Sequence, residues 1–173
     1  MKNEALEVLK TRRSVRAYRP EQISDEALYA VLDAGTWAPT GRNRQTPVIV
    51  AVQNKEERDE VSRLNAKIMG TDRDPYYGAP TIVVVLAEND DFAQLNGAAV
   101  TTNMLNAAHA VGLGSCWIHR PRQMFETPEG KALLRLWGLS EDLVGVASIA
   151  LGCAAGDEPK PAPRKENYYI VRK

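Results

Sequence analysis

The chain has 173 residues, a length typical of one domain, and 44% of them are hydrophobic, as in ordinary globular proteins. Its 22 basic and 22 acidic side chains balance, which argues against general nucleic-acid binding. The longest apolar run, Ala79 to Ala87, is too short to cross a bilayer, and the first residues lack the apolar segment of a signal peptide. We therefore expect a cytoplasmic protein that forms a single domain over residues 1–173, with no membrane contact.

Apolar periodicity and turn residues divide the chain into alternating helices and strands. In chain order they predict helix 3–10, helix 24–35, strand 47–53, helix 54–70, strand 81–87, helix 91–111, strand 114–118, helix 127–138, strand 144–151 and a last strand at 168–171. Ser24 and Thr127 are suited to cap the helices that they precede, and Asn54 with Glu57 predicts a capping box.

The pattern predicts an α/β (α+β) fold with a β-sheet flanked by helices. The strand at 81–87 is apolar on both faces, so we expect it in the centre of the sheet. Small residues line the helix at 91–111, which indicates that other helices approach it closely. The strand at 168–171 follows a proline-rich arm beginning at Glu158, and it could extend the sheet of a partner.

Histidines and cysteines give no sign of a metal site. His109 and His119 have no ligand spacing to each other or to Cys116 and Cys153, and the cysteines form no CxxC pair. We interpret both cysteines as reduced core thiols, with a disulfide or a catalytic role as the alternative. Because no catalytic triad or acid–base pair stands out, an enzyme of this kind would depend on an organic cofactor.

The segment from Lys10 to Arg19 is the most unusual one. It carries five basic side chains and no acidic one, although the whole chain is neutral. Arginine presents a rigid fork of donors that suits phosphate oxygens, and Ser14 can add a hydroxyl. The alternative is a solvated turn whose arginines pair with distant carboxylates.

Four motifs, in order, resemble the flavin-dependent nitroreductase family over essentially the whole chain. They are Arg12-Arg13-Ser14-Val15-Arg16-Ala17-Tyr18, the segment Ala38 to Gln45 before Pro47, the helix and strand from Asn103 to Ile118, and Leu151-Gly152 before a Pro/Arg arm. The resemblance implies a three-layer fold with a central mixed sheet. It also implies an FMN-binding homodimer that exchanges its C-terminal strand and holds the flavin at the subunit interface.

The resemblance further implies roles for single residues. Arg12 and Ser14 would lie at the phosphate and ribityl end of FMN, and Arg16 near the pyrimidine edge of its ring, where a cation stabilises the reduced flavin. Arg13 would be a further cofactor-binding residue without an assigned contact. The remaining implied contacts are Pro39, Thr40, Gly41 and Asn43 from the other subunit, the backbone at Ile118 and His119 toward flavin N5 or O4, and Arg164 or Lys165 at the phosphate.

The implied reaction is a ping-pong transfer of electrons from NADH or NADPH through flavin N5 to an electron-poor acceptor, such as a nitroaromatic or a quinone. Relatives with the same flavin fold carry out dehalogenation, azoline oxidation or flavin breakdown, so a different reaction is an alternative. A non-enzymatic phosphate- or RNA-binding module is the remaining one. Tyr18 is the only aromatic residue in the basic segment, which disfavours RNA.

This sequence departs from the family pattern at two places. After Trp117-Ile118 it has His119-Arg120-Pro121-Arg122 where the family often has glycine. A histidine at this position could act on a substrate or contribute only its backbone. A further flavin ligand that many members carry before the second strand has no assignment, with Lys67, Asp72 and Arg73 as the available polar residues.

Overall fold

The computed structural model describes residues 2–156 and 159–173, so Glu158 at the start of the proline-rich arm lies outside the described residues. The elements are α1 (Glu4–Thr11), α2 (Asp25–Thr36), η1 (Gly41–Asn43), β1 (Val48–Val52), α3 (Lys55–Met69), β2 (Thr81–Ala87), α4 (Ala93–Ala110), β3 (Gly114–Ile118), α5 (Pro121–Glu126), α6 (Pro128–Leu136) and β4 (Val144–Gly152). The predicted helices and the first four predicted strands are therefore confirmed. The turn η1 and the helix α5 were not predicted.

The strands form one sheet in the order β1-β2-β4-β3, with β2 and β4 in the centre. All three strand pairs are antiparallel, so the expectation of a mixed sheet is wrong for the described residues. The apolar pattern of a strand fixes which face each side chain occupies but not the direction of the strand. The helices and loops between these strands are long enough to return the chain to either end of the sheet.

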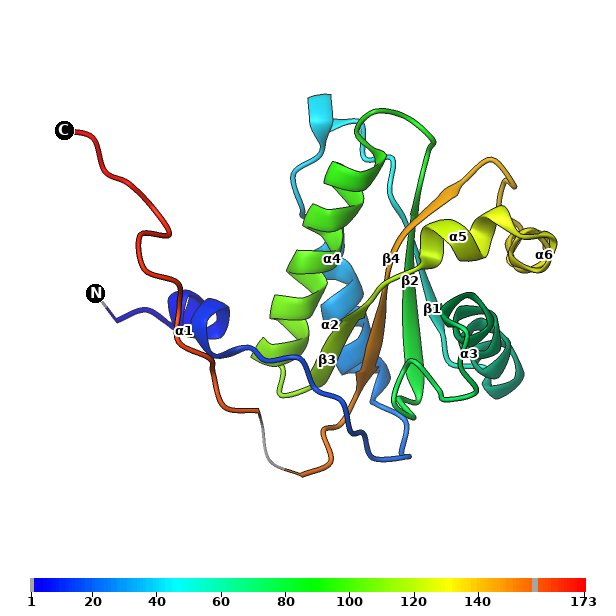
Figure 1. Ribbon diagram of the computed structural model, residues 1–173, viewed down its shortest axis with the longest axis horizontal. Helices are drawn as coiled ribbons and strands as arrows, with labels where there is room; N and C mark the ends of the chain where they lie inside the picture. The colour runs from blue at the N-terminus through cyan, green and yellow to red at the C-terminus, as the bar shows by residue number, and fades with distance from the viewer. Residues whose placement is uncertain (1, 157–158) are drawn as a thin grey trace.

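Side chains of β2 alternate between two hydrophobic cores, which accounts for its uniform apolar sequence. Val83 and Val85 face the core formed with α2 and α4, whereas Ile82 and Val84 face the core formed with α3, α5 and α6. Figure 1 shows these two helical layers on opposite sides of the sheet. The expected three-layer α+β arrangement is confirmed.

Helix starts follow the predicted caps with one difference. Ser24 Oγ accepts a hydrogen bond from the backbone N–H of Ala27, and Thr127 Oγ1 accepts one from Gly130. Asn54 Oδ1 likewise accepts from the N–H of Glu57. The Glu57 carboxylate, however, accepts from Trp137 Nε1 at 2.7 Å, so this side chain joins α3 to Trp137 after α6 rather than completing a capping box.

The C-terminal tail forms no strand with the described part of its own chain. Tyr168 to Val171 are exposed, with Tyr169 the most open at 83%. Figure 1 shows the tail passing α1 and leading away from the sheet, so the predicted strand at 168–171 stays a prediction that needs a partner. Among the described residues, no helix is both long and apolar enough for a membrane span.

Candidate flavin site

The basic segment after α1 is attached to the outer edge of β3. Ser14 and Ser115 form a parallel bridge, and the N–H of Val15 donates to Ser115 O at 3.0 Å. The hydroxyl of Tyr18 donates to Val15 O at 2.8 Å and to Ala150 O at 3.2 Å, and burial raises its pKa. These contacts fix the backbone of the segment against the sheet.

The cations of this segment are not neutralised by carboxylates. Among the described residues, no Asp or Glu lies within ion-pair distance of Lys10, Arg12, Arg13, Arg16 or Arg19. The interpretation of the segment as a turn that pairs with distant acids therefore finds no support here. Arg12 is half-buried, so its uncompensated charge needs an anion more than a fully exposed arginine does.

Arg13 has a structural use within the segment. Its guanidinium donates to the backbone oxygens of Lys10 and Arg12, both at 2.7 Å, and so caps the C-terminal end of α1. This geometry turns the Arg13 fork toward its own backbone. Arg13 Nε is buried with no hydrogen-bond partner among the described residues, and Arg12, Ser14 and Arg16 also have donors available to a ligand.

The thiol of Cys116, on β3, lies next to the hydroxyl of Ser14. Burial raises the pKa of its thiol, although Arg16, the hydroxyl of Ser14 and Arg12 act in the opposite direction. Neither Cys116 nor Cys153 is in a disulfide. A buried thiol with a raised pKa is a poor nucleophile, as expected for a core cysteine.

Strand β3 leads from the basic segment to the second predicted contact point. Ile118 lies three positions beyond Ser115, a span of about 10 Å along a strand. Since Ser115 O faces the outer edge, the alternation of backbone groups turns the N–H of Ile118 toward β4 and that of His119 toward the open edge. His119 therefore has the N–H that a ligand can reach.

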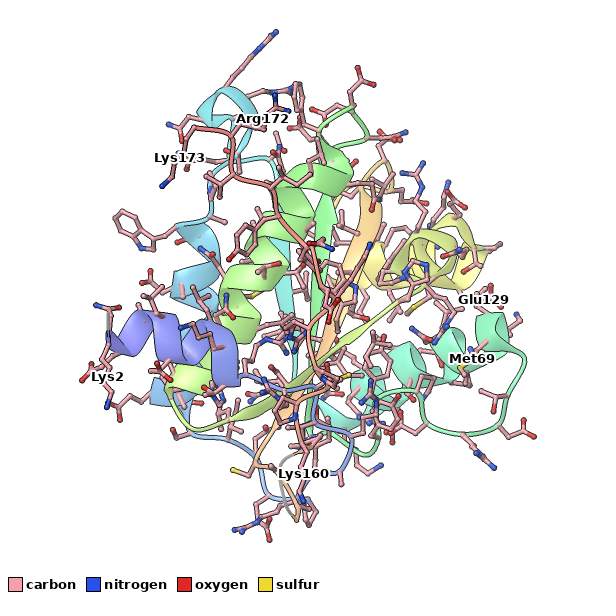
Figure 2. The ribbon with its side chains drawn as sticks, turned by 60° about the vertical axis from the view of Figure 1, so that its left-hand side comes forward. Lys2, Met69, Glu129, Lys160, Arg172 and Lys173 are labelled. Atoms are coloured by element: carbon pink, nitrogen blue, oxygen red, sulfur yellow. The ribbon has the colours of Figure 1, made fainter. Side chains whose placement is uncertain are left out.

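A cavity of about 590 Å³ opens at this end of β3. Its lining includes Tyr77 and Trp117 as aromatic residues and Arg73, His119 and Arg120 as basic or titratable ones. Of the residues considered for the unassigned ligand, Lys67 is paired with Glu129 at 2.6 Å, and Figure 2 shows Glu129 beside Met69 at the end of α3. Arg73 lines the cavity and Asp72 does not, so Arg73 is the candidate that the geometry favours.

The loop before β2 is organised by Asp74, which the sequence did not single out. Its carboxylate accepts hydrogen bonds from Arg58, from Ser62 Oγ at 2.6 Å and from the N–H groups of Tyr76 and Gly78, both at 2.8 Å. Burial opposes ionisation of this group, but these hydrogen bonds outweigh it and hold the pKa of Asp74 below its usual value.

Replacing Asp74 with asparagine should lower the free energy of unfolding at pH 7 by about 1–2 kcal/mol, because charge-assisted bonds are lost. Because the pKa of Asp74 is lower in the folded protein than in the unfolded chain, where it is near 3.8, the ionised carboxylate stabilises the fold at pH values above 3.8. This stabilisation is lost as the pH falls through the pKa of the folded protein. Urea unfolding from pH 7 to pH 2.5 should show the two proteins converging in acid. Asp72→Asn, an exposed control in the same loop, should match the parent at every pH.

The loop predicted to contact flavin and the basic segment lie at opposite ends of α4, the longest helix among the described residues. The N–H of Gly41 donates to Asn96 Oδ1 at 2.9 Å near the start of α4, whereas Thr11 Oγ1 lies 2.8 Å from His109 Nε2 near its end. Thirteen residues of helix separate these contacts, about 20 Å. Figure 1 shows η1 and α1 at these two ends. Pro39, Thr40, Gly41 and Asn43 are thus not brought to the basic segment of the same chain.

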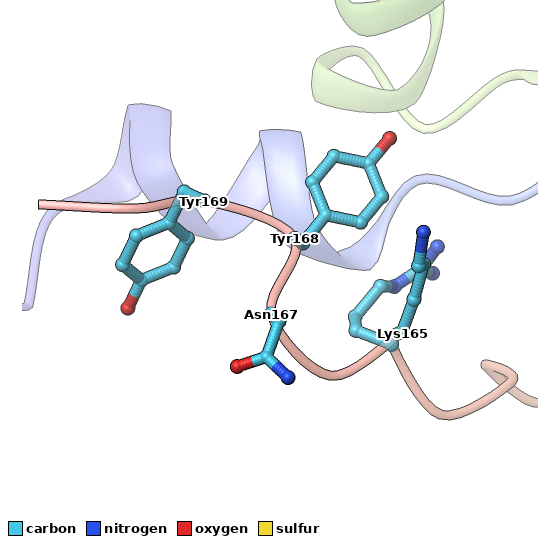
Figure 3. A pocket seen from close by; sticks show the side chains of 5 residues that line it. Lys165, Asn167, Tyr168 and Tyr169 are labelled. Carbon is cyan, nitrogen blue, oxygen red and sulfur yellow. The ribbon is translucent and has the colours of Figure 1, made fainter.

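Arg164 and Lys165 belong to the C-terminal tail, which passes α1. They line a cavity of about 590 Å³ with Asn167, Tyr168 and Tyr169. In Figure 3 this tail crosses α1, and the side chains of Lys165 and Tyr168 extend in one direction while that of Tyr169 points away from them. No hydrogen bond joins either basic side chain to Arg12 or Ser14 among the described residues, and their phosphate role stays a prediction.

Metal ligands do not gather anywhere in the described ranges 2–156 and 159–173, where no group of three or more His, Cys, Asp or Glu could hold an ion. The polar residues that sequence reasoning missed are Asn65, Tyr76 and Ser148, which meet beneath β3. In the sequence, the one sign of this network is that Asn65 and Ser148 are polar residues within an otherwise apolar helix face and strand.

Comparisons with known proteins agree with this arrangement. Residues 9–152 match the model of the nitroreductase family. A nitroreductase of Bacteroides fragilis, solved with bound FMN, is 33% identical and superimposes with a TM-score of 0.91 over 99% of this chain and 100% of its own. Another FMN-bound nitroreductase, from Desulfitobacterium hafniense, is 26% identical with a TM-score of 0.88 over 99% of this chain and 100% of its own.

The curated relatives include an Archaeoglobus fulgidus protein named "Putative NADH dehydrogenase/NAD(P)H nitroreductase". It is 32% identical over 156 residues, which are 86% of this chain and 84% of that protein. The family match covers most of the chain, and two of the four motifs, the basic segment and the end of β3, meet at one sheet edge. The chain belongs to the nitroreductase family.

Proposed function

We propose that this chain is an FMN-dependent oxidoreductase that takes electrons from NADH or NADPH and passes them to electron-poor acceptors in a ping-pong order. The observation that carries the proposal is the uncompensated cation pair, Arg12 and Arg16, on either side of Ser14 at the edge of β3. Family membership and FMN-bound relatives support the flavin. Residues 1–173 would form one cofactor-binding domain.

The donor set suits FMN chemically. Arg12 and Ser14 offer a charged fork and a hydroxyl for a phosphate and a ribityl chain. Farther along β3, the cavity at His119 has aromatic walls and an outward N–H, which suit a planar heterocycle with acceptor atoms. Arg16 and Arg73 add positive charge that would favour a reduced, anionic ring. Bound FMN would supply the redox chemistry that no side chain here provides.

The separation of the two regions proposed to contact flavin supports a homodimer. Gly41 and its neighbours lie about 20 Å along α4 from the basic segment, too far to line one small site. A second copy, related by a two-fold axis, would bring its loop to the first copy's segment. The exposed Leu95 on α4 and the open tail at 168–171 offer apolar surface for such contact. A dimer mass in sedimentation equilibrium is the expected result.

The purified protein should be yellow and carry close to one FMN per chain. It should oxidise NADH or NADPH when menadione or nitrofurazone is present. A yellow protein with no turnover of either nicotinamide would favour a different flavin reaction. A colourless protein that takes up no added FMN would refute the proposal.

A further inference from the structure

A fully buried polar network lies beneath the end of β3. Asn65 from α3, Tyr76 from the loop before β2 and Ser148 from β4 have no exposed surface. Buried polar side chains are costly unless they are paired, and here each one has partners. The network is not needed to join α3 to the sheet, since the apolar residues Val61 and Leu64 on the same helix already pack there.

The hydrogen bonds that reach the backbone of Ile118 and His119 have a determined direction, because a carbonyl oxygen can only accept. Arg120 Nε can only donate and His119 O can only accept, so Asn65 must present Oδ1 to the first and Nδ2 to the second, each at 2.9 Å. Asn65 Nδ2 also lies 3.2 Å from the hydroxyl of Tyr76, which then donates to Ser148 Oγ at 2.9 Å. The Ser148 hydroxyl donates to Ile118 O at 3.2 Å.

Two consecutive peptide groups are therefore held from below. The C=O of Ile118 and the N–H of His119 belong to one planar trans peptide and point in opposite directions. Holding Ile118 O toward Ser148 consequently directs the N–H of His119 to the open edge. Asn65 holds the next peptide through His119 O, and its contact with Arg120 supports a residue with φ of 85°, a strained value for any residue with a side chain.

Burial raises the pKa of Tyr76 to about 12, despite the opposing hydrogen bonds with Ser148 and Asn65. The phenol therefore keeps its proton at neutral pH, and its hydrogen bonds keep the same direction throughout the physiological pH range.

We propose that Asn65, Tyr76 and Ser148 are positioning residues that preorganise the His119 N–H for the flavin ring. This inference rests on the proposed function, because the group being positioned is assigned to FMN. None of the three touches the ligand side of β3. They act through the backbone of Ile118 and His119 and, for Asn65, also through the guanidinium of Arg120.

The test uses two variants that remove one hydroxyl each, Ser148→Ala and Tyr76→Phe. Trp137→Phe is the control, because it removes the hydrogen bond to Glu57, about 12 Å along α3 from Asn65, and keeps an aromatic ring against Phe125. The first measurement is amide hydrogen exchange in FMN-free protein. Exchange at Ile118, whose N–H is turned toward β4, should rise at least fivefold in both test variants and stay at the parental rate in the control.

The second measurement is FMN affinity by fluorescence quenching, with unfolding midpoints recorded for all proteins. Ser148→Ala should raise the dissociation constant about fivefold and shift the flavin absorption band, while the control binds FMN as the parent does. Unchanged exchange at Ile118, or equal loss of affinity in the control, would overturn the inference. A parent that binds no FMN would refute the proposed function, while the exchange result would still decide whether the network fixes this segment.

Discussion

Arg12→Ala is expected to weaken FMN binding by about 10- to 100-fold, the effect of losing a charge-assisted contact worth roughly 1.5–3 kcal/mol. Arg12 is half-buried beside Ser14 and has no carboxylate partner among the described residues. An anionic ligand would therefore supply the negative charge that its guanidinium needs. Arg16→Ala should slow reduction of the bound flavin as well as lower affinity. Titration of FMN-free protein with FMN measures the first effect, and stopped-flow reduction measures the second.

Arg135→Ala is the matched control for Arg12→Ala. It removes the same charge from the protein, but Arg135 lies on α6 and pairs with Glu141 at 2.7 Å. Parental affinity is expected for this control. If Arg12→Ala also retained parental affinity while the protein bound FMN, the phosphate would have to be held by other residues, with Arg164 and Lys165 the first to examine.

Local signals in the sequence were sufficient for most of the fold. The strand over 81–87 is apolar at every position, which requires two covered faces and hence a central place in the sheet, as found. Caps such as Ser24 act within three residues, so their bonds can be predicted from neighbours alone. Strand direction depends on how distant segments pack, and it was here that the expected mixed sheet proved wrong.

The missed helix α5 shows a signal that was present but overlooked. Pro121 occupies its first turn, as Pro128 does in α6, and proline is favoured at that position. Its six residues are too few to display apolar periodicity. Arg120, which precedes α5, adopts a left-handed conformation, and the residue type gives no means of predicting it.

Only part of the candidate site could be found in the sequence. The basic segment stands out because five basic and no acidic side chains fall within ten residues, and its position at β3 agrees with a ligand site there. The Asn65 network draws on three elements that are more than ten residues apart, and each member alone resembles an ordinary polar residue in a core. Such a network is recognisable only once the topology has brought its members together.

Gly145→Ala should be the most destabilising single substitution considered, lowering the free energy of unfolding by about 3 kcal/mol or more. A β-carbon at Gly145 would lie 2.3 Å from both the carbonyl carbon and the oxygen of Pro121. These are backbone atoms at the first residue of α5, so no rotamer change can relieve the overlap. Either β4 or α5 must move, and both are packed against the buried core that contains Met124 and Phe125.

Chemical denaturation compared with Gly138→Ala separates this clash from the general cost of replacing glycine. Gly138 has φ of 69° but nothing within 4 Å of an added β-carbon, so its substitution should cost about 1 kcal/mol. Because α5 follows directly on His119 and Arg120, displacement of Pro121 should also disturb the His119 N–H and lower FMN affinity in any Gly145→Ala protein that folds. Equal stability losses in the two variants would mean that α5 is not held against β4 as described, and the fixed geometry inferred for residues 118–120 would lose its support.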